Sequence, residues 1–387
     1  MGRGSGVSRY LANPRRRPTQ AAGDDGANLR FHRSLPGYSA SPLVDLGEAA
    51  ARAAGVGRLL VKDERERFGL PAFKMLGASW AVHRAVLDRL ERTGGADVDL
   101  DGEPFDVLRR ALQPLRPMGL TAATDGNHGR AVARMAAILD LPCHIYVPAG
   151  TVDARISAIE GEGATVTVVD GTYDDAIRVS AGCGDEWLVI SDTSWPGYTD
   201  IPRWVGDGYA TILHELHEQL DSVPDAVVVP LGVGAFGAAV AAGLPADVGE
   251  PPFILGVEPD DAACVQAAVA AGRVVEVPGP HRSIMAGLNC GLASQTALPA
   301  IMDRFDGFTT VSDEACATAL RTLADLGFDC GECGAATLAG LTSVVGHVPE
   351  LGQDATVVLL CTEGVTDPVS FRAIVGREPH EAALAGS

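Results

Sequence analysis

The chain has 387 residues, an apolar fraction of 47% and a formal net charge of −20. This length allows a large core and is sufficient for two domains. The acidic balance argues against a nucleic-acid partner, and no apolar run is long enough to predict a membrane span.

The N-terminal residues 1–28 are expected to form a mobile extension, because they contain Arg15-Arg16-Arg17 and a Gly/Asp stretch. The extension is rich in arginine but has no apolar centre, so it is not a secretory signal. A cytoplasmic location follows as the expectation.

Eight cysteines are scattered along the chain, and reduced thiols are the default in a cytoplasmic protein. Cys330 and Cys333 form a C-x-x-C motif, but no second pair of ligands completes a zinc site. We therefore predict no metal site. A pairing of Cys264 with Cys290 stays open at this point.

From residue 58 onward, short apolar runs alternate with helical patterns. This alternation predicts parallel sheets covered by helices on both faces, an α/β fold. The insert at 93–117, rich in Asp, Gly and Pro, is expected to be a surface excursion. Strands are predicted at 58–62, 119–124, 143–147, 165–169, 187–191, 226–231, 253–258 and 356–361, and helices at 74–92, 129–140, 153–161, 173–181, 205–220, 236–242, 260–271, 313–326 and 334–345.

The number of predicted units exceeds what one sheet holds comfortably, so two α/β domains are expected. We predict a large domain made of residues 29–84 and 200–387. A smaller domain comprises residues 85–199.

Only two of the 30 basic Lys and Arg residues are lysines, Lys62 and Lys74. A lysine can lose its proton and attack a carbonyl group, whereas an arginine cannot. Lys74 lies at the predicted start of a helix among Phe73, Met75 and Leu76, where its charged form is disfavoured. It is a candidate Schiff-base lysine, and Lys62 is expected to be structural, paired with a carboxylate.

The segment Thr124-Asp125-Gly126-Asn127-His128-Gly129 ends a predicted strand and opens a helix. Such a turn presents backbone N–H groups to an anion. Asp125 is a candidate base and Asn127 a neutral donor, although an Asp N-cap with a glycine turn is the simpler interpretation.

Asp192 follows another predicted strand and is a second candidate base. A single aspartate in a loop is more often a capping or solvated residue. The presence of Asp125 in an equivalent position strengthens the catalytic interpretation, because open α/β sheets bind ligands beyond the carboxyl ends of their strands.

A glycine-rich loop with Gly232, Val233, Gly234, Ala235, Phe236 and Gly237 also follows a strand and can close around a phosphate. The same loop fits G-x-G-x-x-G, with Glu258 at the end of the next strand, which is the dinucleotide fingerprint. A nicotinamide-dependent oxidoreductase is therefore an alternative. Thr362 ends a late strand and could hydrogen-bond a heterocyclic nitrogen.

Taken in order, the Phe73-Lys74 segment, the turn at 124–129 and the glycine loop resemble the tryptophan-synthase-β-like (fold type II) pyridoxal-phosphate enzymes. Within that group the chain is most similar to the diaminopropionate ammonia-lyases. Further stretches that carry this resemblance lie at 170–175, 192–204 and 283–290. The resemblance extends from about residue 30 to residue 375, while Cys330 and Cys333 replace an expected serine-containing stretch.

The resemblance implies a homodimer and a role for each matching residue. Lys74 would carry pyridoxal 5'-phosphate as a Schiff base, Asn127 would contact the ring hydroxyl, residues 232–237 would hold the phosphate, and Thr362 would face the pyridine nitrogen. Serine and threonine dehydratases of this fold usually have Ser where Asp125 stands. The substrate contacts implied more weakly are Thr124, Gly126, His128 and Tyr173.

The predicted reaction is α,β-elimination of D- and L-2,3-diaminopropionate to pyruvate and two ammonia molecules. Asp125 and Asp192 would each remove the Cα proton of one enantiomer. The alternatives are a serine/threonine dehydratase, a catalytically silent pyridoxal-binding protein and the oxidoreductase named above.

Overall fold

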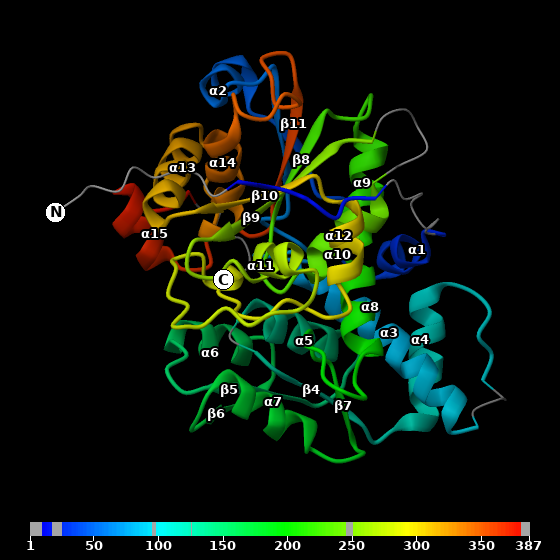
Figure 1. The fold of residues 1–387 in the computed structure, drawn as a ribbon. Helices are drawn as coiled ribbons and strands as arrows, with labels where there is room; N and C mark the ends of the chain where they lie inside the picture. The colour runs from blue at the N-terminus through cyan, green and yellow to red at the C-terminus, as the bar shows by residue number, and fades with distance from the viewer. Residues whose placement is uncertain (1–9, 18–24, 95–97, 125, 245–250, 381–387) are drawn as a thin grey trace. The chain divides into compact units, whose positions relative to one another are not determined.

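The computed structural model describes residues 10–17, 25–94, 98–124, 126–244 and 251–380 (Figure 1). The chain divides into two compact units. The large unit comprises the chain up to Asp24, Ala40–Glu66 and the chain from Ile212 to Gly386, and the small unit comprises Asp25–Ser39 and Arg67–Thr211.

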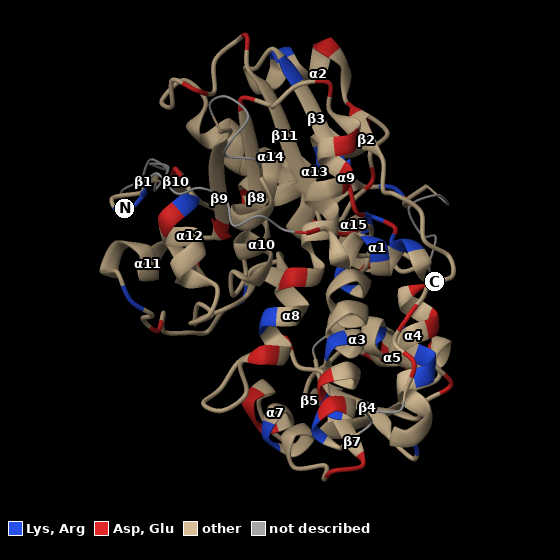
Figure 2. Cartoon of the chain, turned by 90° about the vertical axis from the view of Figure 1, so that its right-hand side faces the viewer, with Lys and Arg blue, Asp and Glu red and all other residues tan. Residues whose placement is uncertain are grey.

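The large unit is built on a seven-stranded sheet in the order β1-β10-β9-β8-β11-β3-β2. Its inner strands are parallel, whereas β1 and β2 pair antiparallel at the two edges. Strands β8 and β11 are apolar runs without charged residues, as Figure 2 shows, because both of their faces are covered. The bounds are β1 (Leu11–Ala12), β2 (Leu43–Asp45), β3 (Arg58–Asp63), β8 (Ala226–Pro230), β9 (Phe253–Pro259), β10 (Gly307–Val311) and β11 (Thr356–Cys361).

Helix α14 lies at the centre of the large unit's core and packs on β8, β9, β10 and β11. A Cβ atom at Gly340 would lie 2.3 Å from Val257 Cγ2, so glycine permits this close contact between α14 and β9. The helices associated with this unit are α2 (Gly47–Ala54), α9 (Ala210–Gln219), α10 (Ala235–Gly243), α11 (Cys264–Ala271), α12 (Leu298–Arg304), α13 (Asp313–Asp325), α14 (Glu332–Val344) and α15 (Pro368–Val375), with the 3-10 turn η2 (Ala286–Leu288).

The small unit contains a four-stranded parallel sheet in the order β6-β5-β4-β7. Helix α3 packs against α8, and a Cβ atom at Gly208 would lie 2.4 Å from the Leu76 carbonyl oxygen. The strands are β4 (Gly119–Ala123), β5 (Cys143–Pro148), β6 (Thr165–Val169) and β7 (Trp187–Val189); the helices are α1 (Ala27–Ser34), α3 (Lys74–Arg92), α4 (Pro104–Leu112), α5 (Asn127–Ile138), α6 (Asp153–Glu160), α7 (Tyr173–Ala181) and α8 (Asp200–Gly208), with η1 (Gln113–Leu115).

The predicted α/β class with parallel-rich sheets is confirmed, and each predicted strand is present within two residues of its expected ends. Three strands were not predicted. β1 and β2 are two and three residues long, and β10 (Gly307–Val311) has the sequence GFTTV between polar turns. β1 and β2 are short strands at the edges of the sheet, and such strands carry too little alternation to be seen in a sequence.

Three predicted segments differ from the structure, and in the first of them the helix predicted at 260–271 begins only at Cys264. The single helix predicted at 205–220 is two helices, α8 and α9, separated at Tyr209. The predicted surface excursion at 93–117 contains the amphipathic helix α4, whose Val107 and Leu108 are buried, and α4 packs against α3. A proline at the start of α4 signals this helix in the sequence.

The N-terminal segment also differs from the mobile extension predicted at 1–28. Leu11 and Ala12 pair with β10, Arg15 Nε donates to the Val269 carbonyl at 2.7 Å, and Arg16 forms an ion pair with Asp306. Residues 1–9 and 18–24 lie outside the described residues. The compact units place residues 67–84 with the small unit, because α3 packs against α4, α5 and α8. The domain limits at residues 84 and 199, which the sequence predicted, stay a prediction.

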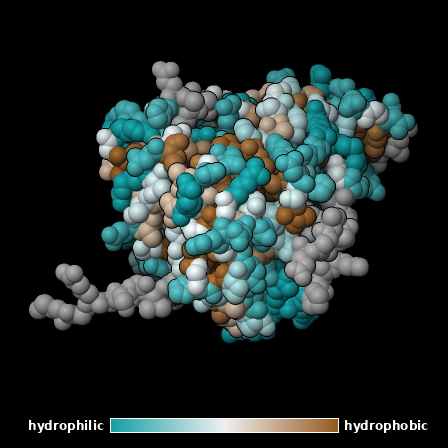
Figure 3. All heavy atoms as spheres, turned by 90° about the horizontal axis from the view of Figure 1, so that it is seen from above, coloured by the Kyte–Doolittle hydropathy of each residue, from teal (hydrophilic) through white to brown (hydrophobic). Residues whose placement is uncertain are grey.

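Within the described ranges, none of the helices is both long and apolar enough to cross a membrane. Figure 3 shows that apolar side chains on the displayed face form patches between hydrophilic ones. The described residues also contain no group of three or more His, Cys, Asp or Glu side chains suited to a metal ion.

Candidate active site

The two lysines occupy different environments. Lys62 is fully buried on β3, and its Nζ lies 2.9 Å from Glu215 Oε2 and 2.7 Å from the Ser41 carbonyl oxygen. The predicted structural role of Lys62, paired with a carboxylate, agrees with this geometry. Lys74 is the first residue of α3, and 29% of its side chain is exposed.

The Lys74 amine lies beside a carboxylate and two aromatic rings. Its Nζ is 3.5 Å from Asp192 Oδ2, 5.4 Å from the centroid of the Phe73 ring and 5.8 Å from that of Tyr209. Burial raises the pKa of Tyr209 to about 12, although the Lys74 charge lowers it. Tyr209 therefore carries a protonated phenol at neutral pH. The structure thus brings together two of the residues that the sequence singled out, Lys74 and Asp192.

Asp192 is held ionised by its neighbours. Burial raises the pKa of the Asp192 carboxyl, but a charge on His128, the charge of Lys74 and a hydrogen bond from Lys74 together hold this pKa below its ordinary value. His128 Nδ1 lies 4.0 Å from the same oxygen, Oδ2. An ionised carboxylate next to a primary amine can act as a general base for a nearby C–H group.

Tyr198, which the sequence reading did not single out, fixes the segment that carries Asp192. Its hydroxyl donates to the Val189 carbonyl at 2.7 Å and accepts from the Ser191 N–H at 3.0 Å. The Tyr198 ring stacks on Trp195, with 4.0 Å between centroids. The Trp-Pro-Gly-Tyr sequence is a turn signal and could have indicated this closed loop.

Thr124 organises the turn that precedes α5. Its hydroxyl oxygen accepts hydrogen bonds from the N–H groups of Gly126, at 3.0 Å, and Gly129, at 3.1 Å. A Cβ atom at Gly129 would lie 2.2 Å from Thr124 Cγ2, so only glycine fits there. The Asn127 side chain follows at the first position of α5. Asp125, the other predicted base, lies outside the described residues.

Tyr173 begins α7, which Thr172 and Asp175 cap by a reciprocal capping box. The Tyr173 hydroxyl lies 3.5 Å from Thr193 Oγ1, one residue after Asp192. Tyr173, Thr193 and Asp192 therefore belong to one cluster of the small unit.

The glycine loop lies in the large unit and leads into α10. Gly234 has a φ of 99° and is the N-cap of that helix, which has no side-chain cap within the described chain. A Cβ atom at Gly232 would lie 3.0 Å from the Gly287 carbonyl oxygen, and one at Gly237 would lie 2.6 Å from Leu231 Cδ2. Backbone N–H groups at a helix N-terminus, without a competing side chain, fit a phosphate group.

The dinucleotide interpretation of this loop is not supported by Glu258. Glu258 is fully buried, and its two carboxylate oxygens accept the N–H groups of Val265 and Gln266, both at 2.7 Å. Burial raises the pKa of Glu258 to about 8. Through these two hydrogen bonds the Glu258 side chain caps the start of α11 and is not available to a ribose.

Thr362 follows β11 and is buried. Beside it, Cys361 lies next to Cys330, and burial raises the pKa of the Cys361 thiol. Glu363 joins the C-x-x-C segment to β11, because its Oε1 accepts the Cys333 N–H at 3.3 Å. No disulfide joins any of the eight cysteines, all of which lie within the described residues, so the pairing of Cys264 with Cys290 that the sequence left open is not formed in this structure.

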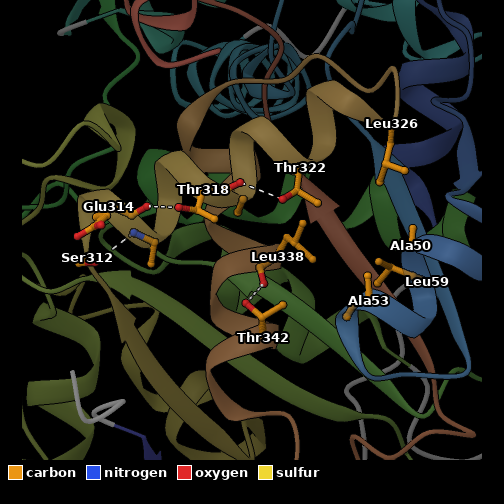
Figure 4. Close-up of a pocket in the computed structure, with 13 residues that line it drawn as sticks. Ala50, Ala53, Leu59, Ser312, Glu314, Thr318, Thr322, Leu326, Leu338 and Thr342 are labelled. Atoms are coloured by element: carbon orange, nitrogen blue, oxygen red, sulfur yellow. Dashed lines mark hydrogen bonds between the residues drawn. The ribbon is translucent and has the colours of Figure 1, made fainter. Parts of the chain in front are cut away.

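A cavity of about 540 Å³ lies in the large unit between α2, α13 and α14 (Figure 4). Alanine, leucine and threonine side chains line it, and the hydroxyls of Thr318, Thr322 and Thr342 donate to carbonyls of their own helices. None of the predicted site residues lines this cavity.

Comparison with known proteins gives one consistent result. The family model for pyridoxal-phosphate dependent enzymes matches residues 35–363. The diaminopropionate ammonia-lyase of Escherichia coli strain K12 is 35% identical over 374 residues, covering 92% of each chain. The biosynthetic L-threonine dehydratase of Mycobacterium leprae is 32% identical over 75% of this chain and 69% of that protein.

Solved structures of diaminopropionate ammonia-lyase also resemble this chain. The holo form of diaminopropionate ammonia-lyase from Escherichia coli superposes with a TM-score of 0.84 at 32% identity, covering 95% of this chain and 96% of that one. The same enzyme in complex with D-serine gives a TM-score of 0.83 over the same shares of both chains.

Proposed function

The chain belongs to the family of pyridoxal-phosphate dependent enzymes, and on that premise we propose that it is a carbon–nitrogen lyase acting on 2,3-diaminopropionate. The products would be pyruvate and two ammonia molecules, from either enantiomer. The observation that carries the proposal is the pair formed by Lys74 Nζ and Asp192 Oδ2, 3.5 Å apart. A nucleophilic amine next to a carboxylate base is the arrangement that Cα deprotonation needs.

Pyridoxal phosphate, when bound, supplies an aldehyde that joins an amine and a ring system that accepts the Cα electron pair. Lys74 would hold the aldehyde and Asn127 the ring hydroxyl. The loop at residues 232–237 would bind the phosphate, because the N-terminus of α10 presents N–H groups there. Thr362 would donate its hydroxyl to the ring nitrogen, which leaves that nitrogen unprotonated.

Asp192 would remove the Cα proton of one enantiomer. Its pKa lies below the ordinary value, so it is ionised at neutral pH and ready to accept a proton. Asp125, outside the described residues, would serve the opposite face. A carboxylic acid near the β-nitrogen would also favour this substrate over serine, because an amine takes up a proton more readily than the hydroxyl of serine does.

Smaller contributions to substrate binding are proposed for Thr124, Gly126, His128 and Tyr173. The Tyr173 hydroxyl, 3.5 Å from Thr193 Oγ1, lies on the segment that carries Asp192. We further propose that the enzyme is a cytoplasmic homodimer, as the resemblance to the ammonia-lyases implies.

Ammonia and pyruvate release from D- and L-diaminopropionate, compared with L-serine and L-threonine, tests the proposal. We expect both enantiomers to be consumed at least tenfold faster than serine. A preference for serine or threonine would assign the chain to the dehydratases. A protein that is yellow but consumes none of the four substrates would be a silent cofactor-binding protein.

Three variants test the assigned residues. Lys74→Ala should lose the visible absorbance of the bound cofactor on dialysis, and Lys74→Arg should lose it too, although it keeps the positive charge beside Asp192. Cofactor absorbance retained by both variants would remove Lys74 from its role. Asp192→Asn should slow one enantiomer more than the other, and equal mild losses would contradict the assignment of one base to each face.

A further inference from the structure

His128 has a buried ring nitrogen that the proposed roles do not use. The side chain lies at the start of α5 and is 4% exposed. Nε2 lies 2.8 Å from the Ile190 carbonyl oxygen, which can only accept a hydrogen bond. The proton of a neutral ring therefore belongs on Nε2, and Nδ1 presents its lone pair.

Nδ1 of His128 faces Asp192 but makes no hydrogen bond. It lies 4.0 Å from Asp192 Oδ2 and has no partner in the part of the chain that the structure describes. A buried acceptor without a donor costs roughly 1–3 kcal/mol. An ionised Asp192 cannot relieve this cost, because a carboxylate also offers only lone pairs.

The charged and titratable groups around Asp192 come from three helices and its own loop. Lys74 of α3 and His128 of α5 approach the same oxygen, Oδ2, from 3.5 and 4.0 Å. Tyr209 follows α8, and Tyr198 lies on the same loop as Asp192 and donates to Val189. Lys74 supplies a positive charge that stabilises the carboxylate whether or not His128 is protonated.

We propose that His128 is a positioning residue that holds, through Nδ1, the proton that Asp192 takes from the substrate. This inference rests on the proposed function. As the Cα–H bond breaks, its electron pair stays with the substrate and the proton moves to Asp192 Oδ2. The new O–H group donates to Nδ1, and the 4.0 Å separation shortens to roughly 2.7 Å. The proton then passes to the β-nitrogen as the C–N bond breaks, while His128 keeps its Nε2 proton throughout.

The hydrogen bond would exist only after proton transfer, so it stabilises the protonated base and not the resting carboxylate. Interactions of that kind raise the rate of the chemical step. They also keep the proton within reach of the leaving amine, which departs poorly unless it is protonated. The same Asp192 would then act first as base and next as acid for one enantiomer.

Two substitutions separate this role from a structural one. His128→Gln places an amide nitrogen near the former Nε2 position, where it can still donate to Ile190, but no atom replaces Nδ1. His128→Asn places an amide oxygen near the former Nδ1 position and cannot reach Ile190. If catalysis depends on Nδ1, His128→Gln should lose more activity than His128→Asn. If it depends on the hydrogen bond to Ile190, His128→Asn should lose more activity.

Turnover of both enantiomers by the holoenzyme is the first readout. We expect His128→Gln to lower kcat about tenfold or more for the enantiomer that Asp192→Asn slows, with a smaller effect on KM, as for a lost hydrogen bond of about 1.4 kcal/mol. The other enantiomer should lose less than about threefold, and His128→Asn should retain more activity than His128→Gln. Equal losses for both enantiomers, or greater damage from Asn, would overturn the inference.

The second readout needs no cofactor. Long-range ¹H–¹⁵N spectra of the ¹⁵N-labelled apoprotein at pH 8 report which imidazole nitrogen carries the proton, and the signal missing from His128→Gln identifies His128. We expect a protonated Nε2 and a bare Nδ1. A proton on Nδ1 would overturn the inference even if the enzyme is active, whereas a parent enzyme that consumes neither enantiomer would overturn the proposed function as well.

Discussion

Replacing Lys62 by methionine should destabilise the protein strongly while leaving its chemistry intact. Lys62 and Glu215 are both fully buried, and their charged atoms lie 2.9 Å apart. Methionine fills a similar volume without a charge, so the substitution removes the cation that lies 2.9 Å from the buried Glu215 carboxylate. Breaking a buried pair in this way typically costs about 3–5 kcal/mol.

Protonation sets an upper bound on this cost. The variant can relieve the buried charge by taking up a proton, and for an ordinary glutamate, with a pKa of about 4.3, this costs roughly 3.7 kcal/mol at pH 7. We therefore expect a loss of about 3–4 kcal/mol at pH 7. At pH 5 the same protonation costs only about 1 kcal/mol, so the loss should shrink as the pH falls.

Urea unfolding of the holoprotein, followed by circular dichroism at pH 5 and pH 7 with saturating cofactor, measures both effects. The matched control is Arg58→Met on the same strand, because its ion pair with Asp45 is about half exposed and should be worth less than about 1 kcal/mol. Adding Glu215→Gln to Lys62→Met should recover at least about 2 kcal/mol, because the buried negative charge is gone.

Three results would refute the reasoning about Lys62. One is a loss below about 1 kcal/mol at pH 7, another is an equal loss at both pH values, and the third is a double variant no more stable than the single one. The folded single variant should keep the cofactor absorbance that Lys74→Ala loses. Loss of that absorbance from folded Lys62→Met would show that Lys62 has a role beyond stability.

Two further predictions concern other buried charges. The buried Arg304 guanidinium has no hydrogen-bond partner among the described residues. Arg304→Met should therefore raise the free energy of unfolding by about 1–3 kcal/mol. A variant that is less stable than the parent in urea unfolding would contradict this prediction. Burial raises the pKa of Asp329, but hydrogen bonds from Arg377 and His380 hold it below its ordinary value. The stability that the Asp329 carboxylate contributes is therefore present above the pKa of an aspartate in the unfolded chain and is lost as the pH falls. The difference in free energy of unfolding between the parent and Asp329→Asn, measured in urea, should shrink from pH 5 to pH 2. A difference that stays constant over this range would contradict the role of the carboxylate.

The sequence predicted the central strands because their apolar runs reflect burial on both faces. β8 (AVVVP) and β11 (TVVLLC) contain no charged residue and are buried along almost their whole length. It could not predict β1 or β2, since strands of two or three residues depend on the neighbour they pair with. The break between α8 and α9 at Tyr209 follows from tertiary packing, which propensities do not record.

The candidate site was predictable where residue chemistry was unusual. Lys74 stood out as one of two lysines, and Asp192 stood out by its place after a strand, although nothing in the sequence set the 3.5 Å between them. Tyr198 and the tautomer of His128 were not predictable, because both follow from hydrogen bonds to backbone carbonyls. Glu258 was misread because its distance from the glycine loop fits a fingerprint, whereas its carboxylate caps α11.

A physical reason favours lysine over arginine at each of the two positions where lysine occurs. Lys62 fits a closed, fully buried pocket formed by Ser41, Glu215 and Gln219, where the larger guanidinium of arginine would bring two further nitrogens that need acceptors. At position 74 an arginine could pair with Asp192 equally well, so the ion pair does not explain the lysine there. What arginine cannot do is lose its proton and form a covalent bond to an aldehyde, so the proposed cofactor-binding role would require lysine at position 74.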